Sequence, residues 1–326
     1  EENPVSFDKL IVIPGDVTDA GPEIRAKIRA EIDRPFTDIW HCVATFKFTE
    51  EERKEIEAVN LQGVHNMLDL VLNLNGEGEK PRYFHVSTAY SSGREKGIVP
   101  EAFVRHGNEV RSLYEWSKHE GEAIVANYQK EHQLDVTIFR PSIIVGSPAT
   151  TVVSYTAYYQ VIESLYRMSR FLERKGEDFD GTLDIRLPGH YDTRINFVPI
   201  DYVNEAMLLI AAEPSLQNKT LKVFNIVNEN PITMRLLHKV ASDSMGVSGI
   251  KIVPPEELEE ASKNRLERAM ARSTAFQTPY MSEELHWSMK QFREYVSEEE
   301  LPPLDMNERF LSAINKMFID HLDETL

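Results

Sequence analysis

A phenol and an amine lie four residues apart in the segment Tyr114-Glu-Trp-Ser-Lys118. On a helix this spacing places both side chains on one face, with their Cβ atoms about 5–6 Å apart. A nearby ammonium favours the phenolate and lowers the pKa of the phenol, so the hydroxyl can exchange a proton with a substrate oxygen near neutral pH. The pair therefore predicts carbonyl/alcohol redox chemistry. Because about one such match arises by chance in a chain of this length, its weight depends on its position.

Two hydroxyl side chains, Ser87 and Thr88, end the predicted strand 82–88. Ligands of open α/β sheets bind beyond the carboxyl ends of the strands, so we expect these hydroxyls to face the same crevice as the Tyr114 helix. A hydroxyl there can hydrogen-bond the reacting oxygen. The alternative, in which a strand-end hydroxyl only satisfies nearby backbone, carries about equal weight for each residue taken alone.

These residues need a scaffold, and the first half of the sequence alternates short apolar runs with amphipathic stretches, as a parallel sheet covered by helices requires. The predicted strands are 9–14, 38–44, 82–88 and 135–140, and the predicted helices are 21–32, 50–74 and 110–132. Thr49 and Glu52 form a capping-box signal for the second helix.

After Gly146 the regular alternation ends. The predicted order is helix 153–175, strand 183–187, strand 194–198, helix 201–212, strand 222–227, a helix opened by Asn230 and Pro231, and charged helices from 254 on. We expect a dinucleotide-binding domain over 1–150 and a substrate-binding or lid region over 151–326, with 194–227 returning to the main sheet.

Composition excludes several classes of protein. The net charge of −17 disfavours nucleic acid as a partner, because binding it depends on neutralising phosphates. Cys42 is the single cysteine, which rules out an internal disulfide and favours a reducing cytoplasm. No run approaches the roughly 18 apolar residues of a membrane span. His41 and His85 lack the spaced partners of a zinc site, so satisfied buried histidines are the better interpretation and no metal is expected.

Several ordered segments between about residues 9 and 212 resemble the extended short-chain dehydrogenase/reductase family, specifically its fatty-acyl or thioester reductase branch, also called male-sterility-like. The segments are 12–19, 38–44, 60–63, 84–90, 114–118 with Glu122, 140–146 and 196–201. Their joint order is much more specific than any one of them.

The resemblance implies a role for each matching residue. Tyr114 would be the proton donor/acceptor, Lys118 its activator and a ribose ligand, and Thr88 or Ser87 the hydroxyl that polarises the carbonyl. The implied cofactor contacts are Asp16 and Val17 at the adenine, Cys42, Val43 and Ala44 along the ribose and phosphates, Asn60 as support for that loop and the catalytic water network, and Pro141, Ser142 and Ile143 beside the nicotinamide. The alternatives are a turn-capping carboxylate for Asp16 and an interior amide for Asn60.

The resemblance also implies a Rossmann-like, doubly wound parallel sheet with a smaller, mainly helical C-terminal part. Its glycine-rich phosphate-binding turn, with the first strand and helix, would precede Glu1, so we expect this sequence to be part of a longer chain. The alternative is an authentic short chain, which would put cofactor binding in doubt.

The favoured hypothesis is NAD(P)H-dependent reduction of an acyl thioester or related carbonyl, with NADP as cofactor and NAD as the other option. The substrate would be a small molecule, with coenzyme A or an acyl carrier protein as its carrier, and a homodimer through the Tyr114 helix is one expectation. The tyrosines at 155, 158, 159 and 166 could line an acyl pocket or pack in the core.

Two alternatives stay open. One is a nucleotide-sugar epimerase or dehydratase, or a small-carbonyl reductase, of the same superfamily; a sugar diphosphate would need basic groups, and Arg167, Arg170, Arg186 and Arg194 could supply them. The other is a non-catalytic dinucleotide sensor or scaffold, against which the joint presence of Thr88, Tyr114 and Lys118 argues.

Overall fold

The computed structural model describes residues 9–19, 21–149, 158–175, 179–275 and 277–325. The chain divides into two compact units. The first comprises Glu1–Ser91, Ala102–Phe139 and Gln217–Val223, and the second comprises Ser92–Glu101, Arg140–Leu216 and Phe224–Leu326. The division into functional domains at residues 150 and 151 stays a prediction.

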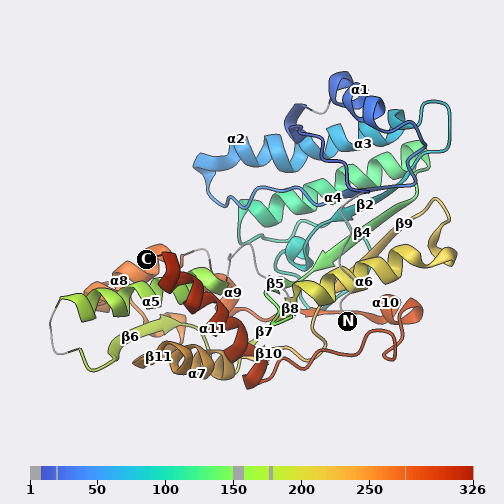
Figure 1. The fold of residues 1–326 in the computed structure, drawn as a ribbon. Coiled ribbons are helices and arrows are strands. Elements are labelled where there is room, and N and C mark those ends of the chain that lie inside the picture. The colour runs from blue at the N-terminus through green and yellow to red at the C-terminus, as the bar shows by residue number, and fades with distance from the viewer. Residues whose placement is uncertain (1–8, 20, 150–157, 176–178, 276, 326) are drawn as a thin grey trace. The chain divides into compact units, whose positions relative to one another are not determined.

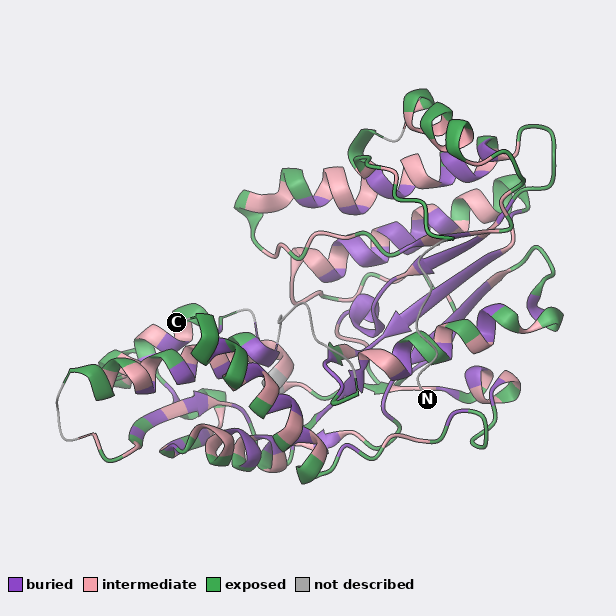
Figure 2. Ribbon diagram, in the orientation of Figure 1, coloured by how far each residue is buried: buried purple, intermediate pink, exposed green. Residues whose placement is uncertain are grey.

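A four-stranded sheet forms the centre of the α/β fold. Its strand order is β1 (Asp38–His41), β2 (Arg82–Val86), β4 (Val136–Pro141) and β9 (Leu221–Ile226). β1 pairs in parallel with β2, and β2 in parallel with β4. Figure 2 shows these strands as largely buried, and β4 is buried at every position, as expected for a strand of a parallel sheet that is covered on both faces. The expected parallel α/β class is confirmed.

Two helices, α3 (Gly63–Leu74) and α4 (Leu113–His132), lie side by side along the sheet (Figure 1). Leu68 and Val71 of α3 and Val125 of α4 pack with Tyr83 and Ile138 of the sheet in one buried cluster. The segment before α3 consists of η2 (Glu50–Glu52), α2 (Arg53–Ile56) and a π-helical turn, η3 (Glu57–Gln62). The predicted capping box is present at its start, where Glu52 Oε2 accepts from Thr49 N at 3.2 Å.

Two predicted elements are wrong. Residues 9–14 form no strand, and Val12 is 81% exposed. β1 is the end strand of the sheet among the described residues, and this segment does not pair with its free edge. The helix expected to open at Asn230 begins later, as α7 (Met234–Met245), because Thr233 caps it by accepting from Leu236 N at 3.3 Å.

The second unit contains a parallel pair formed by β6 (Thr182–Pro188) and β11 (Ser248–Val253). α5 (Tyr158–Arg174), α7 and α11 (Glu308–Thr325) share its buried cluster, which includes Ile162, Leu183 and Phe318. A second parallel pair, β5 (Ile143–Val145) with β8 (Phe197–Pro199), leads into α6 (Ile200–Ala212).

The remaining elements are short. They are η1 (Val17–Asp19), α1 (Pro22–Glu31), η4 (Ala89–Ser92), β3 (Ile98–Val99), β7 (Arg194–Ile195), η5 (Pro214–Leu216), β10 (Ile232–Thr233), η6 (Pro255–Glu257), η7 (Glu260–Ser262), α8 (Arg265–Ser273), α9 (Thr278–Ser282), β12 (His286–Trp287) and α10 (Lys290–Tyr295). None of the helices in the described ranges has the length and apolar composition needed to cross a bilayer.

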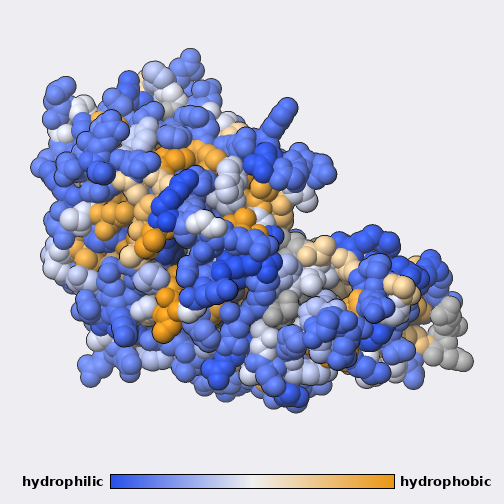
Figure 3. Space-filling view, turned by 180° about the vertical axis from the view of Figure 1, so that it is seen from behind, coloured by the Kyte–Doolittle hydropathy of each residue, from blue (hydrophilic) through white to orange (hydrophobic). Residues whose placement is uncertain are grey.

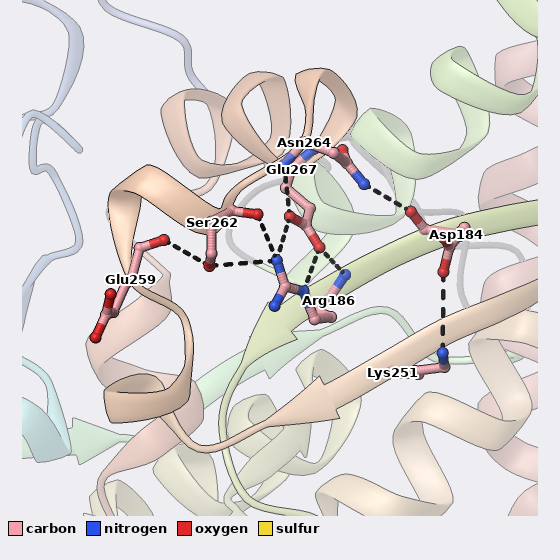
Figure 4. Close-up of polar contacts among 7 residues, drawn as sticks. All are labelled: Asp184, Arg186, Lys251, Glu259, Ser262, Asn264 and Glu267. Atoms are coloured by element: carbon pink, nitrogen blue, oxygen red, sulfur yellow. Dashed lines mark hydrogen bonds and ion pairs between the residues drawn. The ribbon is translucent and has the colours of Figure 1, made fainter.

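An ion pair between a partly buried arginine and a buried glutamate ties α8 to β6 in the second unit (Figure 4). Arg186 donates to Glu267 through Nε at 2.7 Å and Nη2 at 2.9 Å, and also to Ser262 O at 2.9 Å. Asn264 caps α8 by accepting from Glu267 N at 2.9 Å. The hydrogen bonds from Arg186 lower the pKa of Glu267 to about 2, so this carboxylate is ionised and fully paired.

The tyrosines that could line an acyl pocket or pack in the core lie only partly within the described residues. Tyr155 lies outside the described residues. Tyr158 and Tyr159 are buried in the core of the second unit, where Tyr158 donates to Asn315 Oδ1 at 2.8 Å and Tyr159 Oη accepts from Gly146 N at 2.9 Å. For these two residues core packing is confirmed.

Candidate active site

α4 brings the predicted phenol and amine together. Ser112 caps the helix by accepting from Glu115 N at 3.2 Å, which fixes where its first turn begins. The Nζ atom of Lys118 lies 5.9 Å from the centre of the Tyr114 ring. The same amine donates to the carbonyl oxygen of Val86 at 2.9 Å, at the end of β2. Lys118 and its neighbour Tyr114 therefore lie beside the end of β2, which Ser87 and Thr88 follow.

Both strand-end hydroxyls are buried. Ser87 donates to Oε1 of Glu122, and Ser91 donates to the same oxygen at 2.8 Å. The Oγ1 atom of Thr88 accepts from Tyr90 N at 3.3 Å. The proton of Ser87 is therefore committed to a carboxylate in this structure. The catalytic assignment of either residue stays a prediction.

Glu122 is part of the segments that carry the resemblance, but the sequence predicted no role for it in the site. Its side chain is fully buried on α4, and its charge partly offsets the effect of burial on Lys118. It lies four residues after Lys118, so helical spacing places the two on one face, a signal that could have identified it.

The loop after β1 is fixed in place by Asn60, which lies in the π-helical turn η3. The amide oxygen of Asn60 accepts from Thr45 N at 2.8 Å, and its amide nitrogen donates to Thr45 O at 3.2 Å and to Ser117 Oγ at 2.9 Å. Asn60 therefore connects this loop to α4, one residue from Lys118.

The predicted cofactor residues of this loop lie at the surface. Cys42 and Val43 are exposed, the latter by 53%, and Ala44 is partly buried. An exposed loop at the carboxyl end of a parallel strand suits an extended nucleotide. Its contact with a cofactor stays a prediction.

Asp16 and Val17 belong to the turn around η1. The carboxylate of Asp16 accepts from the backbone nitrogen and the hydroxyl of Thr18, both at 2.8 Å, and the backbone hydrogen bond lowers its pKa. The carbonyl of Val17 accepts from Asn66 Nδ2 at 2.8 Å. This geometry matches the turn-capping interpretation of Asp16 and leaves its role toward adenine a prediction.

Pro141, Ser142 and Ile143 belong to the second unit. Ser142 donates to Asn196 Oδ1 at 2.7 Å, and Ile143 pairs with Phe197. Their place beside a nicotinamide stays a prediction.

Burial sets the protonation of the α4 pair. It lowers the pKa of Lys118 to about 8, although Glu122 and Cys42 oppose the shift. It raises the pKa of Tyr114 above the ordinary value, and Glu115 adds to the rise. The sequence led us to expect a lowered phenol pKa, and that expectation is wrong for the protein alone, because burial and the Glu115 carboxylate both favour the neutral phenol.

His41 on β1, with Tyr83 and His85 on β2, forms a second cluster of polar side chains. His41 Nδ1 and the hydroxyl of Tyr83 lie 2.6 Å apart, and the rings of His41 and His85 are 5.3 Å apart. Within the described ranges, both ring nitrogens of His85 and Nε2 of His41 have no hydrogen-bond partner. Both histidines are buried as predicted, but the prediction that their hydrogen-bonding groups are all paired is wrong for these three nitrogens. No group of three or more metal-ligating side chains occurs among the described residues.

Comparison with known proteins gives the family. The model of an NAD-binding family described as male sterility protein matches residues 2–207. No curated protein matches the chain.

Solved structures show which folds are alike. The thiolation-reductase di-domain of an archaeal non-ribosomal peptide synthetase has a TM-score of 0.69 and 18% identity, over 100% of this chain and 64% of that one. The terminal R domain of the myxalamid PKS-NRPS pathway has a TM-score of 0.68 and 16% identity, over 96% and 75%. The UDP-glucuronic acid 4-epimerase of Bacillus cereus, in complex with NAD, has a TM-score of 0.62 and 14% identity, over 94% and 80%. At these identities the likeness concerns the fold.

Proposed function

The chain belongs to the male sterility protein family, an NAD(P)-dependent group of the extended short-chain dehydrogenase type, and from this premise we propose that it reduces acyl thioesters to aldehydes. The thiolation-reductase di-domain and the R domain among similar folds support this choice. We further propose that residues 1–150 hold the cofactor and that the substrate is carried on coenzyme A or an acyl carrier protein.

One observation carries the proposal. The Lys118 amine lies 5.9 Å from the centre of the Tyr114 ring and donates to Val86 O at 2.9 Å, at the strand end that Ser87 and Thr88 follow, and Tyr114 is a neutral phenol at physiological pH. A neutral phenol is the proton donor that a reduction needs at the substrate oxygen. Lys118 then stabilises the phenolate that forms.

The reaction balances with one hydride and one proton. The reduced nicotinamide cofactor, when bound, supplies the hydride to the thioester carbon. Thr88 and Tyr114 hydrogen-bond the carbonyl oxygen, and Tyr114 gives it the proton. Loss of the thiol, which takes up the hydroxyl proton, leaves the aldehyde.

The nucleotide-sugar alternative has less support. Three of the four arginines that could bind a diphosphate are paired with carboxylates: Arg167 with Glu163, Arg170 with Glu173 and Arg186 with Glu267. An ionised partner offsets the charge that a diphosphate would need.

The test is a Tyr114→Phe variant, assayed for NADPH oxidation with an acyl-CoA and for conversion of a UDP-sugar. The variant removes only the hydroxyl, so we expect thioester reduction to fall about 10²–10⁴-fold. Tyr128→Phe is the matched control, since Tyr128 lies on the same helix and donates to Asp69 Oδ1 at 3.0 Å. Unchanged reduction by Tyr114→Phe would remove the catalytic assignment, and turnover of the UDP-sugar alone would favour the epimerase.

A further inference from the structure

An aromatic side chain covers one side of the proposed catalytic phenol. The rings of Phe46 and Tyr114 are stacked, with centroids 5.0 Å apart and an interplanar angle of 21°. A third ring, that of Phe48, has its centroid 5.9 Å from that of Tyr114 at an interplanar angle of 71°. Sequence reasoning did not identify either phenylalanine, because both lie in a loop without regular spacing.

Phe46 is 58% exposed. Figure 3 shows a molecular face that is mostly hydrophilic, with hydrophobic side chains in separate patches. Val43, on the same loop, is 53% exposed, so this loop presents two large apolar side chains to its surroundings. A single exposed apolar residue is common on protein surfaces, but an exposed ring stacked on a candidate catalytic residue is a special position.

The loop holds Phe46 in a defined place. On one side of it, Asn60 bonds both backbone groups of Thr45, at 2.8 and 3.2 Å. On the other side, the backbone nitrogen of Phe48 donates to Glu52 Oε2 at 3.0 Å. Phe46 therefore lies between two anchored residues, and its ring needs little ordering before it can contact a ligand.

We propose that Phe46 is a specificity-determining residue, whose exposed ring forms an apolar wall for the carbons of the acyl group next to the reacting carbonyl. This inference rests on the proposed thioester reduction. A carbonyl oxygen hydrogen-bonded to Tyr114 brings the adjoining acyl carbons within a few ångströms of the phenol, and the stacked ring is its immediate neighbour.

Apolar carbons gain from leaving water against such a ring, whereas the hydroxyl-rich face of a sugar would lose hydration without gaining partners. The wall thus favours acyl groups with an apolar chain over a bare acetyl group.

The test compares octanoyl-CoA with acetyl-CoA, using the full chain with NADPH. We expect Phe46→Ser to lower the ratio of kcat/KM values, octanoyl over acetyl, about tenfold. Phe46→Leu, which keeps an apolar surface, should retain most of the preference. Phe171→Ser is the matched control, since Phe171 is 52% exposed on α5 and has Lys175 Nζ 5.0 Å from its ring centre.

The ratio separates substrate contact from any general effect on Tyr114, because a disturbed phenol would slow both thioesters equally. An unchanged ratio in Phe46→Ser would overturn the assignment of Phe46 while leaving thioester reduction in place. A raised KM for NADPH with an unchanged ratio would also overturn it and assign Phe46 to the cofactor. A wild-type chain that reduces neither thioester, under conditions where it turns over another carbonyl, would overturn the proposed function itself and this inference with it.

Discussion

Two polar clusters, one in each unit, differ in whether their buried titratable side chains have hydrogen-bond partners. In the second unit, Glu267 is 3% exposed and receives donors from Arg186 and Asn264 (Figure 4). These bonds lower its pKa and hold it ionised. In the first unit, below α4, His85 is 2% exposed and neither of its ring nitrogens has a partner among the described residues. Burial there lowers the pKa values of His41, His85 and Lys118.

The difference separates a structural cluster from a candidate functional one. A charge that is buried with all its partners stays ionised and holds two elements together. A group that is buried without them moves toward its neutral form, at a cost of about 1–3 kcal/mol for each unsatisfied polar atom. Perturbed groups of this second kind gather at sites that transfer protons, and here they gather around Lys118.

The largest expected effect is on the structural cluster. Arg186→Met should lower the free energy of unfolding more than any other single change considered below, because it leaves the Glu267 carboxylate, which is 3% exposed, without its charged partner. Arg167→Met is the control, since the pair of Arg167 with Glu163 is exposed and should contribute under about 0.5 kcal/mol. Chemical denaturation measures both. Equal losses would mean that the Glu267 cluster is no more than a surface ion pair.

The second prediction concerns acid stability in the first unit. Burial lowers the pKa of His41 to about 4, below the value near 6.5 of an unfolded chain. Between these values the unfolded chain binds a proton that the folded chain does not, so stability is present above about pH 6.5 and is lost as the pH falls toward 4. The loss from pH 7 to 4.5 should be about 2–3 kcal/mol from His41.

His41→Gln should remove that part of the acid sensitivity while keeping a hydrogen-bonding group near Tyr83. The control is His286→Gln, because the His286 side chain is 61% exposed. Urea unfolding at the two pH values gives the comparison. The same pH dependence in His41→Gln and the wild type would show that His41 is not held neutral by burial.

The third prediction tests whether the cluster around Lys118 serves activity more than stability. Lys118→Met should lower thioester reduction about thirtyfold or more, since the phenolate loses its cation. Its free energy of unfolding at pH 7 should fall less than that of Arg186→Met, because burial lowers the pKa of Lys118 and the ammonium is therefore held at a cost that its loss relieves. A stability loss as large as that of Arg186→Met, with activity retained, would reverse the comparison.

The sequence was sufficient for features that depend on local spacing. Tyr114 and Lys118 share a helical face whatever surrounds them, and β2 and β4 are rich in the β-branched and aromatic residues that are typical of a covered parallel sheet. The segment 9–14 shows the limit of this reasoning, because an apolar run becomes a strand only where another strand pairs with it.

Only the tertiary structure decided the properties that depend on neighbours distant in sequence. It placed Phe46 on the Tyr114 ring, joined Ser87 to Glu122 and left His85 without partners. It also reversed the expected shift of the Tyr114 pKa. A sequence shows which charges lie near a phenol along a helix. How far the phenol is removed from water depends on packing, and this desolvation is the largest cause of the raised Tyr114 pKa.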